Sequence, residues 1–325
     1  MKILVTGATG FIGGHLLPRL LQDKHEIVVA TRHTNSVEKL SIPVPHVVVG
    51  EIDGNTDWSE ALSGIDAVIH LAGRAHILQE NVADPEAEFQ RVNVTGTKNL
   101  VKQSLAAGVK RFIFISSIGA VATLSDRILT EETPPQPDTP YGRSKLEAEQ
   151  ALVKLTENTA MSWTILRPTL VYGEGNPGNM ANLLKLIQLR IPLPLGAINN
   201  RRNFLYVGNL VDAIALCLTH SQAVNKLFLI GDTERLSTPE LIQQIATALS
   251  ISVTLIPIPL SFLKLLGSWG DFSSNILGKS LPINSNVVSK LSGSLAVDNS
   301  QICSSLNWQP PYSIKQGLVR GLSSK

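Results

Sequence analysis

A tyrosine and a lysine, Tyr141 and Lys145, stand four residues apart directly after the proline-rich run TPPQPDTP. On a helix, that spacing puts both side chains on one face. A tyrosine with its ordinary pKa of about 10 is a slow acid or base at neutral pH, and a neighbouring ammonium favours the phenolate and lowers that pKa. The pair therefore predicts proton transfer to or from a substrate oxygen. The alternative is an exposed polar first turn of a helix.

Three glycines, Gly7, Gly10 and Gly13, form the motif G-x-x-G-x-x-G between the apolar run KILVT and the helical stretch FIGGHLL. The first permits a tight turn, the second lets the backbone approach a pyrophosphate, and the third lets the helix pack closely on the strand. The helix N-terminus then offers N–H groups and the positive end of its dipole to the anion. In this strand–helix context the motif predicts dinucleotide binding rather than a plain glycine-rich turn.

The second apolar run ends in VVATRHT, so Arg32 stands where a carboxylate would bind the ribose 2′-hydroxyl of NAD. A guanidinium suits a 2′-phosphate, which a carboxylate would repel. The sequence therefore favours NADP as the cofactor, with NAD as the alternative. A solvated surface arginine is the other interpretation of Arg32.

These residues need a scaffold, and the first half of the chain supplies one by alternating apolar runs with helical stretches. The runs are rich in Val and Ile and read as strands buried on both faces of a parallel sheet; they cover residues 2–6, 26–30, 46–50, 66–72, 111–117 and 162–168. Between them lie amphipathic helices, one beginning at Pro85 and stopping at Gly108, another beginning at Tyr141. The pattern predicts an α/β fold with a doubly wound parallel sheet of the Rossmann type.

After Pro168 prolines and glycines become frequent, which predicts a smaller C-terminal α/β substrate lobe. We expect residues 1–170 to form the dinucleotide-binding domain, with some later segments returning to it, and residues 171–325 to form mainly the lobe. Two convincing helices follow, VGNLVDAIALCLTH and STPELIQQIATALS, the second opened by a Ser237–Glu240 capping box.

The most apolar late stretch is 251–270, which prolines, glycines and Lys264 interrupt, so it is too broken to span a membrane. We interpret it as strand, loop and buried helix and expect no stable membrane insertion; a membrane-surface role is the less favoured alternative.

Composition excludes several classes of protein. The chain of 325 residues is 43% hydrophobic and 17% charged, which indicates a globular enzyme rather than a disordered chain. Its net charge is +2 and no basic run exceeds two residues, so we expect no nucleic-acid partner. Two cysteines make no disulfide framework, and no His, Cys or carboxylate cluster has metal-ligand spacing. With no signal peptide visible before the first strand, we expect a cytoplasmic protein.

Seven motifs, in this order along nearly the whole chain, resemble the extended short-chain dehydrogenase/reductases, specifically the NAD-dependent epimerase/dehydratase group that acts on nucleotide sugars. They are TGATGFIGGHL, VIHLAGRA, NVTGTKNL, FIFISS, YGRSKLEAE, ILRPTLVYGEG and RRNFLYVGNLVDA. The later segments look closest to a branch that reduces UDP-linked 4-keto-6-deoxy-N-acetylhexoses in surface polysaccharide synthesis, members of which are often labelled UDP-glucose 4-epimerase.

The resemblance implies a catalytic set of Ser117, Tyr141 and Lys145. Ser117 ends a strand at the edge where ligands bind in open α/β sheets, and from there it can hydrogen-bond a sugar oxygen. Its neighbour Ser116 is the competing candidate, but strand alternation points the two side chains to opposite faces. Arg143 and Ser144, between Tyr141 and Lys145, are assigned to the solvent side of the helix.

The family's dinucleotide contacts carry over to the phosphate loop and to three strand ends. They imply Phe11 and Ile12 in the loop, Leu71, Ala72 and Gly73 under the dinucleotide, Pro168 and Val171 near the nicotinamide, Ile52 against the adenine, and Tyr141 and Lys145 beside the nicotinamide ribose. The family commonly has an aspartate for the adenine amine, and here Glu51 or Asp53 would have to serve.

For a UDP-sugar substrate, the resemblance implies Arg202 as a charged fork for the diphosphate and Asn179 as a phosphate contact, with Ser117 and Tyr141 at the sugar. The position after Arg202 is Asn203, where the family usually has aspartate.

Two histidines are candidates for a catalytic role, His70 and His76. His70 ends a buried strand, and we interpret it as a hydrogen-bonded structural residue.

The reaction predicted first is hydride transfer from NADPH to the C4 ketone of a UDP-4-keto-6-deoxy-N-acetylhexosamine, with Tyr141 giving the proton. The alternative is a UDP-sugar 4-epimerase, which the same residues would serve; a non-catalytic dinucleotide-binding subunit is a more remote one. A dehydratase is disfavoured because Ile118 and Gly119 follow Ser117 where that reaction needs an acid and a base. The family also implies a homodimer built from helices over 85–103 and 141–155.

Overall fold

The computed structural model describes residues 1–40, 42–75, 84–176, 178–277 and 284–322. Its largest element is a seven-stranded sheet in the order β10-β7-β5-β4-β1-β2-β3, in which every pair of neighbours is parallel. The strands are β1 (Lys2–Thr6), β2 (Glu26–Thr31), β3 (His46–Val48), β4 (Ala67–His70), β5 (Arg111–Ile115), β7 (Ser162–Pro168) and β10 (Lys226–Ile230). The predicted doubly wound parallel sheet is confirmed.

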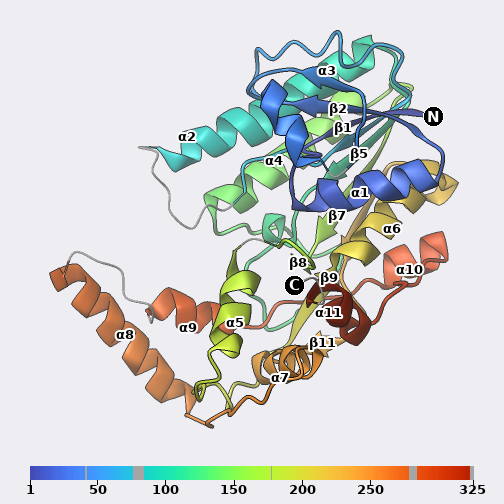
Figure 1. Ribbon diagram of the computed structural model, residues 1–325. Helices are drawn as coiled ribbons and strands as arrows, with labels where there is room; N and C mark the ends of the chain where they lie inside the picture. Colours follow the sequence, from blue (N-terminus) through green and yellow to red (C-terminus); the bar gives the residue numbers. More distant parts are fainter. Residues whose placement is uncertain (41, 76–83, 177, 278–283, 323–325) are drawn as a thin grey trace.

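Two apolar layers cover the sheet, one on each face (Figure 1). Successive residues of β1 enter different layers, with Ile3 and Val5 in one and Leu4 in the other. The first layer contains α1 (Phe11–Gln22), α6 (Val207–Thr219) and α10 (Ser300–Leu306), and the second contains α3 (Thr97–Ala106) and α4 (Pro140–Thr156). Burial on both faces explains why the strands are almost uniformly apolar in sequence.

The helix expected over 85–108 begins and ends where the sequence predicts but is not uniform inside. It starts with α2 (Pro85–Phe89), whose first turn is capped by the Asp84 carboxylate accepting from the Ala87 N–H at 3.0 Å. A π-helical segment (Gln90–Gly96) follows and leads into α3, and the chain leaves the helix through Gly108 at φ +78°. π-helical turns are frequent at functional sites, and this one carries the buried Asn93.

The rest of the chain forms a smaller part (Figure 1), most of it around a third apolar cluster and its two-stranded sheet around a fourth. It contains two small sheets, β11-β9-β8 and β12-β6, and five helices among the described residues. The strands are β6 (Ile128–Leu129), β8 (Leu170–Tyr172), β9 (Arg202–Tyr206), β11 (Arg235–Leu236) and β12 (Ala296–Val297); the helices are α5 (Asn179–Gln188), α7 (Thr238–Ala248), α8 (Leu260–Leu277), α9 (Ser285–Ser292) and α11 (Ile314–Leu322). The predicted Ser237–Glu240 capping box opens α7.

The interpretation of residues 251–270 as strand, loop and buried helix is wrong in two respects. In place of a strand, a single parallel bridge joins Leu255 to Leu193. The helix does form, as the start of α8, but Phe262, Leu265 and Trp269 are exposed on it. The run of apolar residues predicts a helix without indicating what covers it, which is why burial was wrongly inferred. Among the described residues, no helix is long and apolar enough to cross a bilayer.

Candidate active site

Ser117, Tyr141 and Lys145 meet at the carboxyl end of β5, although they come from two separate elements. Ser117 follows the strand, and its hydroxyl oxygen accepts from the Gly119 N–H at 3.0 Å. Tyr141 lies beside Ser117, because a Cβ built on Gly119 would lie 3.3 Å from the Ser117 hydroxyl oxygen and 3.8 Å from the Tyr141 ring. The Lys145 ammonium donates to the Ile115 carbonyl at 2.6 Å. The three residues that the sequence singled out are therefore brought together.

Local sequence fixes where α4 begins and how close it comes to β5. Thr139 caps the helix by accepting from the Gly142 N–H at 3.1 Å, and Pro140 occupies the first turn. A Cβ at Gly142 would collide with the Gly119 carbonyl oxygen. Glycine at this position thus lets the first turn of α4 lie against the loop after β5, which is what brings Tyr141 beside Ser117.

The two serines after β5 have different partners. Ser116 is buried and donates to the Glu149 carboxylate, on the side of the strand away from Ser117. Ser117 instead opens the short 3₁₀ turn Ile118–Ala120 beside Tyr141. The opposite orientation that strand alternation predicts is observed, and Ser117 is the serine next to the tyrosine.

Burial dominates the ionisation of both titratable groups. It raises the pKa of Tyr141, while the hydrogen bond to Ser117 acts in the opposite direction. It lowers the pKa of Lys145 to about 8, against the opposing effect of the Glu149 carboxylate. The Lys145 ammonium also lies 4.3 Å from the centre of the Phe114 ring, which favours its charged form. The expected lowering of the Tyr141 pKa by Lys145 is wrong for this arrangement, because desolvation outweighs any gain.

One residue of this region was missed in the sequence. Asn93 is buried in the π-helical segment, accepts from the Arg74 N–H at 2.7 Å, and donates to the Arg74 carbonyl and to the Ser144 hydroxyl at 3.0 and 2.9 Å. It therefore joins the loop after β4 to the turn of α4 that carries Lys145. The available signal was a lone asparagine between Val92 and Val94 in a helical run.

The same contacts correct the assignment of Ser144 to the solvent side of α4. Ser144 is fully buried, and its hydroxyl donates to the Tyr141 carbonyl at 2.8 Å. Arg143 does lie at the surface, where its guanidinium pairs with Glu86 at 2.8 Å. The buried face of α4 is wide enough for two rows of side chains, since Ser144 and Ala148, one turn apart, are buried beside Lys145 and Glu149.

The glycine loop has the shape of an anion cradle. Gly7 adopts φ +71°, and a Cβ there would lie 2.6 Å from the Ala72 backbone nitrogen, so only glycine fits. Gly10 precedes α1, Phe11 and Ile12 begin it, and Gly13 packs on Ala8. Among the described residues, no side chain caps the first turn of α1 and none in it is acidic. Its N–H groups are thus free to meet a phosphate, and the residues present fit a dinucleotide.

The other predicted dinucleotide contacts lie at neighbouring strand ends. Leu71, Ala72 and Gly73 follow β4, Pro168 ends β7, and Val171 lies in β8. Gly73 lies beside the catalytic set, because a Cβ built on it would lie 3.9 Å from the Lys145 ammonium nitrogen. The β4 end and the β5 end therefore meet at one edge of the sheet, beside the glycine loop.

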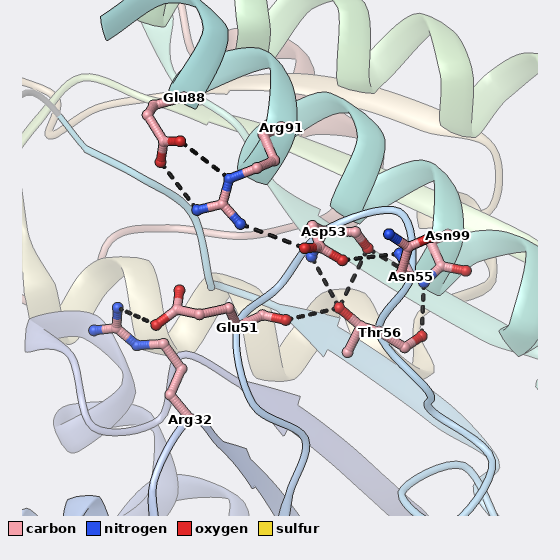
Figure 2. Close-up of polar contacts among 8 residues, drawn as sticks. All are labelled: Arg32, Glu51, Asp53, Asn55, Thr56, Glu88, Arg91 and Asn99. Atoms are coloured by element: carbon pink, nitrogen blue, oxygen red, sulfur yellow. Dashed lines mark hydrogen bonds and ion pairs between the residues drawn. The ribbon is translucent and has the colours of Figure 1, made fainter. Parts of the chain in front are cut away.

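At the end of β2, Figure 2 shows a carboxylate next to the arginine that the sequence singled out. The Glu51 carboxylate lies 3.6 Å from the Arg32 guanidinium, and both side chains are exposed. The Asp53 carboxylate lies 3.4 Å from Arg91, which also pairs with Glu88. Ile52, between the two acids, is buried against Gly96. The edge where the adenosine is expected thus carries both a guanidinium and a carboxylate.

In the smaller part of the molecule, Arg202 begins β9 and its guanidinium donates to the Lys290 carbonyl of α9. Burial lowers the pKa of Arg202. The following residue, Asn203, is buried. Its side-chain amide donates to the Asp232 carbonyl at 2.8 Å and accepts from the Val297 N–H at 2.9 Å. Asn179 begins α5, but its side chain lies outside the described part of the structure.

The structural interpretation of His70 is confirmed. Its ring is buried between the hydroxyls of Thr6 and Thr97, at 2.7 and 3.0 Å, and burial lowers its pKa to about 3, so the imidazole stays neutral. His76 lies outside the described residues. Within the part of the chain that is described, no three His, Cys, Asp or Glu side chains form a potential metal site.

Comparisons with known proteins agree with this arrangement. Residues 3–231 match the NAD dependent epimerase/dehydratase family. A Vibrio cholerae protein named UDP-glucose 4-epimerase is 38% identical over 97% of this chain and 93% of its own. An Escherichia coli O157:H7 protein named N-acetyl-alpha-D-glucosaminyl-diphospho-ditrans,octacis-undecaprenol 4-epimerase is 31% identical over 99% of this chain and 94% of its own.

Solved structures share the fold. The UDP-glucuronic acid 4-epimerase of Bacillus cereus, in complex with NAD, superimposes with a TM-score of 0.76 at 22% identity and covers 98% of this chain and 97% of its own. A Thermotoga maritima UDP-glucose 4-epimerase with UDP-glucose gives the same TM-score and identity over 99% of this chain and 98% of its own.

Proposed function

The chain belongs to the NAD-dependent epimerase/dehydratase family of extended short-chain dehydrogenase/reductases, and we propose that it is a 4-epimerase of a diphosphate-linked sugar. The observation that carries the proposal is the joining of Ser117, Tyr141 and Lys145 beside a glycine-rich phosphate cradle. Two similar proteins that are 38% and 31% identical are named 4-epimerases, which favours this activity over the C4-ketone reductase predicted first.

In the proposed mechanism, Tyr141 in its phenolate form accepts the proton of the C4 hydroxyl and later returns it to the C4 oxygen. Ser117 donates a hydrogen bond to that oxygen and keeps it within reach of Tyr141. Lys145 supplies positive charge, which favours the phenolate once the ammonium turns from the Ile115 carbonyl toward Tyr141. A nicotinamide held near Pro168 and Val171 would supply the reversible hydride acceptor that oxidation and reduction at C4 require.

The residues proposed to hold the dinucleotide surround one edge of the sheet. They are Gly7, Gly10, Phe11, Ile12 and Gly13 in the cradle, Arg32 and Ile52 at the adenosine end, Leu71, Ala72 and Gly73 after β4, Tyr141 and Lys145 in α4, and Pro168 and Val171 near the nicotinamide. We propose that the cofactor is NAD rather than the NADP that Arg32 alone suggested. The Glu51 carboxylate beside Arg32 would repel a 2′-phosphate and can accept from a 2′-hydroxyl.

This choice predicts the cofactor affinities of a Glu51→Gln variant. Wild-type protein will bind NAD more tightly than NADP, and the substitution will shift the ratio of the two dissociation constants toward NADP by about tenfold, because a like charge beside the phosphate is removed. Titration calorimetry with each dinucleotide measures both constants. Glu26→Gln, at the start of β2 and thus at the far end of the strand that leads to Arg32, is the matched control. Tighter NADP binding by the wild type would contradict the assignment.

On the substrate side, we propose that Arg202 binds the diphosphate as a charged fork and that Asn179 contacts a phosphate. A diphosphate occurs both in UDP-sugars and in the lipid-linked sugar named in the E. coli relative, so this role serves either substrate. Residues 171–325 would then form mainly the substrate lobe. A homodimer built from 85–103 and 141–155, and a cytoplasmic location, complete the proposal.

One incubation tests the activity. The purified protein is given UDP-glucose, UDP-N-acetylglucosamine or a UDP-4-keto-6-deoxy sugar, each with and without NADPH. We expect a C4 epimer of one of the first two sugars to form without added cofactor. Consumption of NADPH with the keto sugar alone would instead establish the reductase, and inertness toward all three would favour a non-catalytic subunit or a different diphosphate carrier.

A further inference from the structure

Helix α8 exposes an apolar stripe to solvent. Phe262, Leu265, Leu266 and Trp269 are 51, 53, 39 and 67% exposed, and their spacing of i, i+3, i+4 and i+7 puts them on one face. A different face of the helix packs on α9, where a Cβ at Gly267 would lie 3.1 Å from the Ser285 backbone. In Figure 1, α8 lies at the edge of the molecule, at the end away from the parallel sheet.

Neighbouring segments extend the stripe. Leu189, Ile191 and Ile256 are 65, 48 and 41% exposed. Two hydrogen bonds, from the Leu193 N–H to Thr254 and from the Ile256 N–H back to Leu193, hold the segment after α5 beside the segment before α8. Together the seven side chains form what we call the α8 patch. Contiguous exposed apolar surface of this kind marks an interaction site rather than ordinary surface.

The charged residues around the patch are mainly basic. The segments 179–197 and 251–277 contain Lys185, Arg190 and Lys264 and one carboxylate, Asp271, which faces α9 and accepts from the Ser285 N–H at 3.3 Å. Cations beside an apolar stripe with an exposed tryptophan are typical of helices that lie in the interface of an anionic bilayer.

We propose that the α8 patch docks this protein on an anionic membrane surface. The apolar stripe would enter the boundary between headgroups and acyl chains, and the three cations would face lipid phosphates. Because none of the described helices can span a bilayer, the attachment is peripheral. This proposal does not depend on the proposed activity.

A second copy of the chain fits the α8 patch less well. An isologous contact would bring the same three cations from each copy together without a counter-charge. The seven side chains of the patch, 39 to 67% exposed, offer on the order of 700 Å², close to the ~800 Å² that each partner buries in a stable interface, so the charges rather than the area disfavour a second copy.

The α8 patch is structurally linked to the residue proposed to bind the diphosphate. Helix α9 packs on α8, and the Lys290 carbonyl of α9 accepts from the Arg202 guanidinium. If the proposed function holds, docking would bring this side of the substrate lobe toward the bilayer, where a sugar on a lipid diphosphate is found. This consequence, unlike the docking itself, rests on the proposed function.

Vesicle sedimentation tests the docking. The full-length wild type and a Leu265→Ser/Trp269→Ser variant are mixed with vesicles of phosphatidylcholine with or without phosphatidylglycerol. We expect the wild type to sediment with the anionic vesicles and the variant to partition at least about tenfold more weakly, since two exposed apolar groups are lost. Added salt will weaken wild-type binding because it screens the cations. The matched control is Leu21→Ser, a partly exposed leucine of α1 that should bind within about twofold of the wild type.

Two further measurements separate the possible outcomes. Light scattering without vesicles measures the oligomeric mass of each protein. If the Leu265→Ser/Trp269→Ser variant has a lower mass than the wild type, a second copy covers the patch, and the proposal is overturned. The docking proposal is also overturned if the wild type stays in the supernatant with anionic vesicles, or if the variant sediments as fully as the wild type. Epimerisation of a UDP-sugar in lipid-free solution should be the same in both proteins. If neither protein epimerises a UDP-sugar or a sugar on a lipid diphosphate while sedimentation behaves as expected, the proposed function fails and the docking stands.

Discussion

Replacing Tyr141 by phenylalanine will lower the turnover number for the sugar roughly 100- to 10,000-fold while the dinucleotide remains bound. The substitution removes only the phenolic oxygen, which is the proposed acceptor and donor of the C4 proton. The ring keeps its packing, edge-on to Phe89 at 6.0 Å between ring centres and against Gly119. Loss of activity would thus come from chemistry rather than from a changed fold.

Three measurements make this result specific. Initial rates give the turnover number, titration calorimetry gives the dinucleotide affinity, and thermal unfolding reports the fold. Tyr312→Phe removes a phenol from a tyrosine in the smaller part, packed on Tyr206, and should leave the rate within about twofold. A Tyr141→Phe enzyme that keeps more than a tenth of the wild-type turnover would show that another group moves the proton.

The part of the site that the sequence predicted is the part encoded locally. The glycine loop lies within one strand–turn–helix unit, and Tyr141 and Lys145 lie within one helical turn. In each pattern the spacing along the chain determines how the residues lie relative to one another, so the pattern can be interpreted before the fold is known. The choice of Ser117 over Ser116 needed only the alternation of side chains along a strand.

The contacts that could not be predicted join residues far apart in the chain. Glu51 comes from the segment after β3, and its pairing with Arg32 depends on β2 and β3 being adjacent strands. Asn93 reaches Ser144 across 51 positions of sequence. Local propensity carries no information about such partners, and this also explains why the apolar residues of α8 were wrongly placed in the interior.

Beneath the catalytic set lies a buried ion pair that the sequence did not indicate. The Glu149 carboxylate accepts from the Arg167 guanidinium at 2.6 and 3.0 Å, with both side chains only 4% exposed, and it also accepts from the Ser116 hydroxyl. Glu149 is one helical turn after Lys145, and its charge raises the pKa of that lysine against the effect of burial. The pair connects α4 to β7 directly below the site.

Replacing Glu149 by leucine will lower the free energy of unfolding by about 3–5 kcal/mol, because Arg167 is then a buried charge without its partner. Removing both charges in Glu149→Leu/Arg167→Leu will recover most of the loss, because no unpaired charge remains. Urea unfolding of the three variants, Glu149→Leu, Arg167→Leu and the double, closes a double-mutant cycle.

An exposed ion pair between α4 and α2 is the comparison that shows whether burial causes the loss. Arg143 pairs with Glu86 at the surface, with side chains 39 and 57% exposed, so Glu86→Leu should cost less than about 1 kcal/mol. The two glutamates have similar partners and differ in burial. If Glu149→Leu were no more costly than Glu86→Leu, the desolvation of Arg167 could not be the cause. If the double variant were as unstable as Glu149→Leu alone, the loss would come from packing and from the Ser116 hydroxyl rather than from the unpaired charge.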